Sequence, residues 1–133
     1  MIRFEDLLVK HYILFDYDTS GFYSFDRPHH IFKISDSIHY KSLVNNDFSD
    51  YVNLITTTDQ KEHSLDNFKK LIKEFDINQI KDNKIKICWD ERLSKYIVED
   101  GCHRLSLIMF NKLDENGEMS REWFDIKKSN EYE

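Results

Sequence analysis

The chain has 133 residues, of which 40% are hydrophobic and 14% aromatic, with one Pro and three Gly. This length suits one domain that buries a core without disulfide or metal staples, and the composition excludes the disordered and low-complexity classes. The formal net charge of −6 argues against non-specific nucleic-acid binding, which needs clustered Lys and Arg. No apolar run approaches the ~18 residues of a membrane span and no secretory signal opens the sequence, so we expect a cytoplasmic protein.

The first thirty residues predict a short helix followed by a β-hairpin. Apolar positions within the first ten residues favour a short amphipathic helix. Two aromatic runs, 12–15 and 22–25, flank a link rich in Asp, Ser and Gly, which is typical of a hairpin turn. The stretch 27–30 contains Pro28, which donates no ladder hydrogen bond, and we expect it to end the hairpin.

The middle of the chain predicts a strand followed by three helices. Asp36 or Ser37 suits the N-cap of the first helix, and Ser64 suits that of the third, because their side-chain oxygens accept from free N–H groups. In the third helix apolar residues recur at spacings of three and four, which indicates one buried face. The expected spans are a strand at 31–34, helices at 38–43, 48–55 and 65–75, and a loop at 56–63.

The last third predicts two strands, a glycine turn and an apolar helix. Apolar and polar residues alternate at 85–89, which is typical of a half-buried strand, and after a polar turn the short apolar run 96–98 predicts a second strand. Gly101 then precedes a largely apolar helix. Together the elements indicate a small α+β domain with a mixed sheet. The expected spans are strands at 85–89 and 95–99, a helix at 103–113, a loop at 114–118 and a last strand at 123–126.

The turn 100–104, Asp-Gly-Cys-His-Arg, begins that helix. Unpaired N–H groups and the positive end of the helix dipole favour an anion at such a place. Arg104 adds a planar fork suited to phosphate, unless it pairs with Glu99 or Asp100 instead. His103 either orients a phosphate or passes a proton, or it is a hydrogen-bonded structural residue.

In this setting, between a hairpin and a helix, the turn resembles that of the ParB-like/sulfiredoxin superfamily. Its members share a G-x-H-R or G-E-R-R turn that grips nucleotide phosphates. Residues 101–104 match the sulfiredoxin version, Gly-Cys-His-Arg, and an Asp-Gly pair such as 100–101 is commoner in the superfamily's kinases and nucleases. The resemblance implies a ParB/sulfiredoxin-like domain at 31–126, an added N-terminal extension of helix and hairpin at 1–30, and a tail at 127–133.

A second match lies upstream, where sulfiredoxins carry a K-x-x-S-x-x-x-T pattern at the nucleotide site. Lys61 and Ser64 fit this pattern, but Phe68 stands at the threonine position, where a bulky apolar residue cannot replace a hydroxyl contact. Lys61 would add a point charge from a second helix start. The resemblance thus implies nucleotide binding by Lys61, His63, Ser64, Gly101, Cys102, His103 and Arg104.

The function implied by the resemblance is a nucleotide-dependent phosphotransferase, a kinase that acts on a small molecule or on a carbohydrate or nucleotide precursor. Its cofactors would be ATP or another nucleotide, with Mg. The candidate catalytic residues include two carboxylates, Asp36 and Asp100, because Asp36 follows the first strand as in the amino-acid kinase branch. For each carboxylate the alternative is a helix cap or a pair with Lys. His103 and Cys102 complete the catalytic candidates.

Two alternatives remain open. One is a nucleotide-binding module that does not catalyse, and the other is sulfiredoxin-type thiol chemistry through Cys102. A thiol at a helix start beside Arg and His should have a lowered pKa, although Cys102 also suits a tight turn simply as a small residue. His29, His30, His39 and His63 lack the spacing of a tetrahedral zinc set, so no metal site is assigned to them. The sequence does not define the oligomeric state.

Overall fold

A computed structural model describes residues 1–12, 22–26, 29–54 and 58–127 of the chain. The strands of its larger sheet are β2 (Leu7–Tyr12), β3 (Phe22–Asp26), β4 (His29–Lys33), β5 (Ile85–Asp90), β6 (Lys95–Asp100) and β8 (Phe124–Lys127). Their order across the sheet is β3-β4-β2-β6-β5-β8. β2 runs parallel to β6 and β5 runs parallel to β8, while the other neighbours are antiparallel, so the sheet is mixed, as predicted for an α+β domain.

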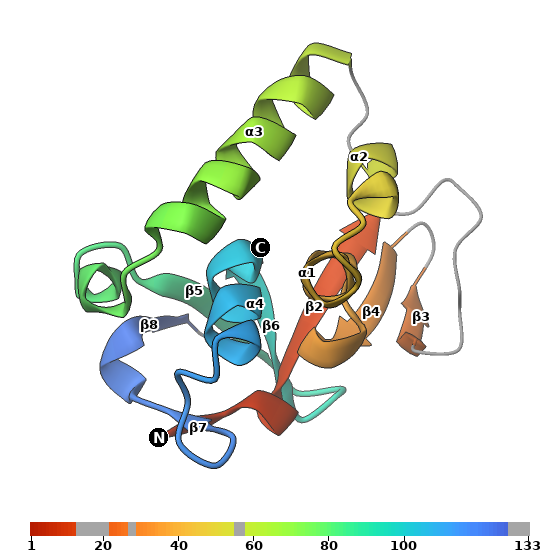
Figure 1. The fold of residues 1–133 in the computed structure, drawn as a ribbon. Coiled ribbons are helices and arrows are strands. Elements are labelled where there is room, and N and C mark those ends of the chain that lie inside the picture. The colour runs from red at the N-terminus through yellow and green to blue at the C-terminus, as the bar shows by residue number, and fades with distance from the viewer. Residues whose placement is uncertain (13–21, 27–28, 55–57, 128–133) are drawn as a thin grey trace.

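The α-helices of the described ranges are α1 (Ile38–Asn45), α2 (Ser49–Leu54), α3 (Thr58–Glu74) and α4 (Cys102–Phe110). α1 and α4 lie side by side over one face of the sheet, and α3 leans outward above them (Figure 1). The main core lies between these helices and the sheet and includes Leu7, Phe32 and Leu105, each with no exposed surface. Within the described ranges, no helix has both the length and the apolar character needed to cross a membrane.

The amino end enters the centre of the sheet instead of forming the predicted helix. Leu7, Leu8 and Val9 are all buried, because β2 has neighbours on both edges and apolar packing on both faces. Such a short apolar run fits a buried strand as well as a helix, which is why its periodicity misled the prediction. Only residues 4–6 form a turn of 3-10 helix.

The predicted hairpin between 12–15 and 22–25 is wrong in its described part. β4 lies between β2 and β3, so Tyr12 and Asp26 both pair with His29 on either side of that strand. Residues 13–21 lie outside the described residues. The boundary drawn at residue 30 comes from the resemblance and stays a prediction, but the sheet itself continues across that position.

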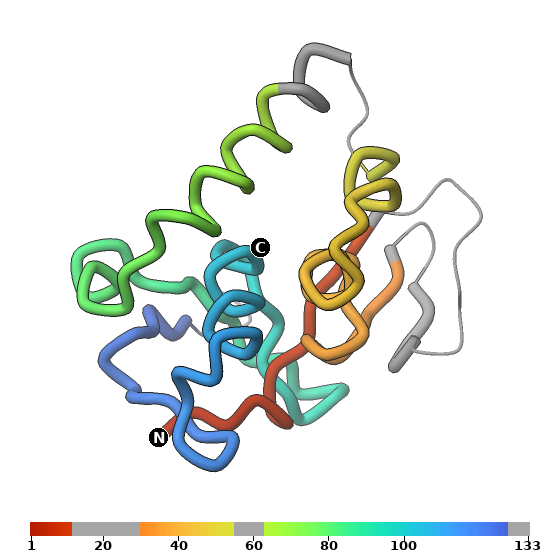
Figure 2. The backbone as a smooth tube through the Cα atoms, viewed as in Figure 1, coloured from red at the N-terminus to blue at the C-terminus, as the bar shows by residue number. Residues whose placement is uncertain are grey.

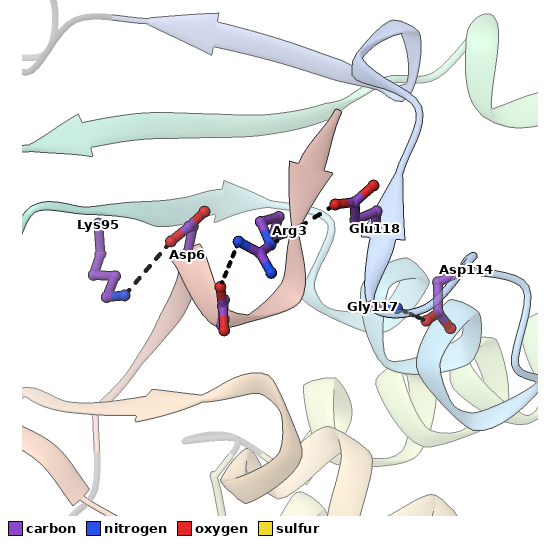
Figure 3. Close-up of polar contacts among 7 residues, drawn as sticks. Arg3, Asp6, Lys95, Asp114, Gly117 and Glu118 are labelled. Atoms are coloured by element: carbon purple, nitrogen blue, oxygen red, sulfur yellow. Dashed lines mark hydrogen bonds and ion pairs between the residues drawn. The ribbon is translucent and has the colours of Figure 1, made fainter.

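Two short strands, β1 (Ile2–Arg3) and β7 (Glu118–Met119), pair antiparallel in a second sheet. Figure 2 follows the backbone from this pair into the centre of the larger sheet. The side chain of Arg3 lies 3.9 Å from a carboxylate oxygen of β7, and the ammonium of Lys95 lies 3.5 Å from Asp6 (Figure 3). These exposed ion pairs contribute little individually, so the amino end is held mainly by backbone pairing and by buried Leu7 to Val9.

Most other elements lie where the sequence predicts them, with two differences at helix starts. The N-cap of α1 is Ser37, whose hydroxyl oxygen accepts from the N–H of Tyr40 at 3.1 Å, and Asp36 ends a 3-10 turn. α3 begins at Thr58, so the predicted loop is wrong from that residue onward and Ser64 lies inside the helix. The reason is that Gln, Lys and Glu after Thr58 are good helix formers. Predictions confirmed apart from shifted ends are the strands at 31–34, 85–89, 95–99 and 123–126 and the helices at 38–43, 48–55, 65–75 and 103–113.

Candidate functional site

The turn from β6 into α4 strongly favours glycine. Gly101 has φ +114°, a conformation that disfavours residues with a Cβ. A Cβ at this position would also lie 2.9 Å from Cγ2 of Ile85, which is completely buried in β5. The backbone of the turn is therefore pressed against the sheet, and α4 starts at a fixed place.

The amino end of α4 carries free backbone donors. Gly101 offers no side chain to cap the helix, and the first helical hydrogen bond runs from the N–H of Leu105 to the carbonyl of Gly101 at 2.9 Å. The N–H groups of residues 102–104 consequently have no acceptor within the helix. Together with the helix dipole they form a positive end suited to an anion.

A cavity of about 390 Å³ adjoins this helix start. One side, here called the α4 wall, consists of Asp100, Gly101, His103 and Arg104. The opposite side, here called the α3 wall, consists of Ser64, Asn67, Phe68 and Leu71. Tyr51 and Asn83 complete the lining. Of the predicted site residues, the structure therefore brings together Ser64, Asp100, Gly101, His103 and Arg104.

Arg104 lies in the α4 wall with its side chain only 12% exposed. Its guanidinium donates to the carbonyl oxygen of Asn83 and lies 3.5 Å from a carboxylate oxygen of Asp100. Burial lowers the pKa of the guanidinium and the charge of Asp100 opposes this, but an arginine in a protein remains protonated. Arg104 therefore both pairs with Asp100 and lines the cavity.

His103 is held by its Nε2 atom, which lies 2.9 Å from the hydroxyl oxygen of Tyr51. Its ring also packs edge-on against Phe68, with 4.8 Å between the centroids. Burial, aided by the charge of Arg104, lowers the pKa of His103 to about 4, while Asp100 opposes the shift. The imidazole is therefore neutral at physiological pH, and a phosphate at this cavity would meet it as an uncharged ring.

Two further histidine rings, His39 and His11, lie behind His103 and outside the described lining. His39 stacks on His11 with 5.2 Å between centroids and meets His103 edge-on at 4.3 Å. Nε2 of His11 accepts from the N–H of Ile38 at 3.2 Å. Burial lowers the pKa of His11 to about 4 and that of His39 well below its ordinary value. Among the described residues no group of three or more His, Cys, Asp or Glu side chains is placed to hold a metal ion.

Cys102 differs from the expectation of a reactive thiolate. The side chain is half-buried and does not belong to the cavity lining. Burial raises the pKa of the thiol to about 12, and this outweighs a lowering by Ser106. The predicted lowering of its pKa is therefore wrong in this structure, because desolvation prevails over the favourable charges at the helix start.

Three other predicted residues are not placed in the lining. Asp36 lies in the 3-10 turn before α1, and His63 is exposed on α3. Lys61 belongs to α3, but its side chain lies outside the described residues. Because Ser64 is inside α3, this helix offers side chains to the cavity and not the free N–H groups of a second helix start.

Tyr51, Asn67 and Asn83 were missed by the sequence reasoning. One signal was present for Asn67, because Ser64, Asn67, Phe68 and Leu71 follow the i, i+3, i+4, i+7 pattern of one helix face. Nothing local marks Tyr51 or Asn83, which reach the cavity only through the tertiary fold. Similarly, His11, His39 and His103 are too far apart in sequence for spacing to predict their contact.

No family model, curated protein or solved structure matches this chain. The resemblance to the ParB-like/sulfiredoxin superfamily therefore stays a prediction, and the function has to be argued from the cavity itself.

Proposed function

We propose that this chain binds a nucleoside di- or triphosphate at the amino end of α4 and transfers a phosphoryl group to a small-molecule acceptor. One observation supports the proposal above all. A cavity of about 390 Å³ joins an uncapped helix start to the buried guanidinium of Arg104. Phosphoryl transfer needs mainly positioning and charge stabilisation, and these are what such a cavity supplies.

The phosphates would be bound by the α4 wall. The free N–H groups of residues 102–104 donate to phosphate oxygens along the helix dipole, and Arg104 contributes a charged fork from the same wall. The carbonyl of Asn83 holds the guanidinium in place before any ligand arrives. Arg104 therefore enters binding already ordered, which reduces the entropy lost on association.

The opposite side of the cavity suits the less polar part of a ligand. Half-buried Leu71 offers aliphatic surface, Phe68 lies behind it at 1% exposed, and the side chains of Asn67 and Ser64 offer hydrogen bonds at the edge. A mixture of apolar surface with a few polar groups is typical of small-molecule sites. It fits a nucleoside or another acceptor of similar size. Phe68, which stands where the sulfiredoxin pattern has a hydroxyl, packs its ring against Tyr51 and His103.

The carboxylate of the α4 wall is Asp100, whose side chain is 64% exposed at the rim. Asp100 is the carboxylate that would contribute an oxygen ligand to a divalent cation bound with the phosphates, and it would then share its charge between that cation and Arg104. Mg would supply neutralisation of charge on the phosphate oxygens.

A non-catalytic nucleotide-binding module is the second candidate. It is favoured by the scarcity of carboxylates, since Asp100 is the one acidic side chain among the described lining residues and Arg104 already pairs with it. Thiol chemistry has less support, because the Cys102 thiol lies outside the lining with a raised pKa.

The test is a thermal-shift series with ATP, ADP and CTP, each with Mg, on the wild type, Arg104→Ala and Arg121→Ala. Arg121 is exposed and outside the described lining, so its variant controls for the loss of one positive charge. We expect nucleotide to raise the Tm of the wild type and of Arg121→Ala but not of Arg104→Ala. Full affinity in Arg104→Ala would overturn the proposal. Binding without turnover on any acceptor panel would favour the non-catalytic candidate.

A further inference from the structure

Tyr51 connects three of the helices around the cavity through one hydroxyl group. It belongs to α2, its oxygen lies 2.9 Å from Nε2 of His103 in α4, and it lies 3.3 Å from the carbonyl oxygen of Ser64 in α3. Tyr51 itself is 2% exposed, so water does not compete freely for these contacts. The direction of the two hydrogen bonds follows from what each partner can donate.

A carbonyl oxygen only accepts, and a phenol has a single proton. If Tyr51 donates to the carbonyl of Ser64, its oxygen is free to accept from an N–H at Nε2 of His103, and both contacts are hydrogen bonds. If Tyr51 donates to His103 instead, the contact with Ser64 is lost. The first arrangement keeps both hydrogen bonds and the second keeps only one, so the first is favoured. Burial also raises the pKa of the phenol to about 12, which keeps its proton in place.

This arrangement leaves Nδ1 of the neutral His103 ring as an acceptor. Among the described residues Nδ1 has no hydrogen-bond partner, and it is not sealed from solvent. In contrast, Nδ1 of His39 is buried without a partner. His103 lines the cavity, and Nδ1 is the one nitrogen of its ring that has no partner among the described residues.

We infer that Tyr51 is a positioning residue that fixes His103 in the Nε2–H tautomer, so that Nδ1 accepts a hydrogen bond from a hydroxyl group of the ligand beside its phosphate. The inference rests on the proposed phosphate site and narrows its ligand to a hydroxyl-bearing phosphate, or to a nucleotide beside an alcohol acceptor. An ionised phosphate oxygen cannot satisfy this acceptor, since it has no proton to donate. The hydroxyl and the phosphate are thus recognised by different groups of the α4 wall.

The first experiment needs no ligand. The ¹⁵N shifts of the imidazole nitrogens of His103 report the tautomer in wild type, Tyr51→Phe and Tyr96→Phe. Tyr96 is a half-buried tyrosine of β6 with no hydroxyl hydrogen bond among the described residues, so its variant controls for the loss of a phenol group. We expect Nε2–H in the wild type and in Tyr96→Phe, and a shift toward Nδ1–H in Tyr51→Phe. An Nδ1–H wild type, or an unchanged tautomer in Tyr51→Phe, overturns the role of Tyr51.

The second experiment uses 2-hydroxyethyl phosphate and ethyl phosphate, which differ by one hydroxyl. We expect the wild type and Tyr96→Phe to bind the hydroxyl compound about 3- to 10-fold more tightly, and this ratio to approach one in Tyr51→Phe. Equal affinities in the wild type overturn the hydroxyl preference while leaving the phosphate site intact. If neither compound binds, the proposed function and the ligand class fail together, and the tautomer measurement still decides the role of Tyr51.

Discussion

The two walls of the cavity are held in different ways. In the α4 wall, the Gly101 backbone is pressed against Ile85, and Arg104 is anchored to the carbonyl of Asn83. In the α3 wall, Phe68 is fully buried, whereas Asn67 is exposed and Ser64 and Leu71 are only partly covered. The charged wall is thus built into the sheet, and the wall that shapes the rest of the ligand depends on a helix that leans away from it (Figure 1).

This difference indicates that the two walls have separate roles in binding. Free N–H groups bind phosphate well only when they are already held in position, because they then need no rearrangement on binding. α3 packs on the core through buried Phe68 and the partly buried Leu65, Leu71 and Ile72, and its exposed residues can change at little cost in stability, since surface substitutions usually have small effects. We therefore expect substitution of Gly101, in the buried turn of the α4 wall, to alter binding and folding together, and variants of exposed α3 positions to alter the choice of ligand alone.

The largest expected effect is on the attachment of the α3 wall. Phe68→Ala should lower the free energy of unfolding by about 4 kcal/mol, because it leaves a cavity among the rings of Tyr51, Phe48 and His103. Leu65→Ala on the same helix, where the side chain is half-buried, should cost about 1 kcal/mol. Urea denaturation followed by circular dichroism measures both. Equal losses would show that α3 is held along its length and not through Phe68.

The next effect concerns the α4 wall. Gly101→Ala should lower the free energy of unfolding by about 3 kcal/mol, because alanine is strained at φ +114° and its Cβ would lie 2.9 Å from Ile85. Gly117→Ala is the control: its φ is +82°, but no atom lies within 4 Å of the added Cβ, so we expect about 1 kcal/mol. If the two glycines respond alike in urea denaturation, the close fit of the turn against β5 contributes nothing.

The histidines behind both walls predict a dependence on pH. In the unfolded chain His11 has a pKa near 6.5, and in the fold burial lowers it to about 4. Between these values the unfolded state binds the proton and the folded state does not, so stability is full above about pH 6.5 and falls as the pH drops toward 4. The lowered pKa of His11 contributes about 3 kcal/mol to the free energy of unfolding at neutral pH, and this contribution is lost below pH 4.

Urea denaturation at several pH values between 7 and 4 checks this prediction, with His11→Asn as the comparison. Asn keeps a side-chain oxygen that can accept from the N–H of Ile38 but does not titrate in this range. The decline in stability should be shallower in the variant. An identical decline would assign the pH dependence to other groups.

The walls also differ in how well the sequence predicted them. The α4 wall is formed by residues close in sequence, because strand, glycine turn and helix follow one another from residue 95 to 110. Gly101 and the apolar run after it were enough to predict this turn and helix. The α3 wall was found only in part. Phe68 and Leu71 were recognised as a buried helix face, but the helix start was placed at Ser64, because the β-branched run 56–58 indicated a loop, whereas the helix already includes Thr58.

What the sequence did not predict depends on contacts between distant residues. The position of β2 between β4 and β6 follows from pairing across 17 to 25 residues on one side and 89 residues on the other, which no local periodicity in the sequence predicts. The contact of Tyr51 with His103 joins residues 52 apart. The raised pKa of Cys102 was missed for the same reason, since desolvation depends on what packs around the thiol.

The smallest expected effect separates the ion pair of Arg104 from its role toward phosphate. Asp100→Asn should change the free energy of unfolding by less than about 1 kcal/mol, because Asp100 is 64% exposed and such pairs contribute little. It should, however, tighten the binding of inorganic phosphate by up to about fivefold, because the guanidinium no longer shares its charge with a carboxylate. Arg104 would stay in place through the carbonyl of Asn83. Isothermal titration calorimetry at low salt measures the gain.

Glu99→Gln provides the matched control, since Glu99 is the neighbouring exposed carboxylate of β6 and does not belong to the described lining. Both variants remove one negative charge close to the cavity, so a general electrostatic effect would raise phosphate affinity in both alike. Release of Arg104 would raise it in Asp100→Asn alone. A gain shared equally by the two variants would mean that the pair with Asp100 does not restrain Arg104, and that the α4 wall binds phosphate through its backbone N–H groups and net charge.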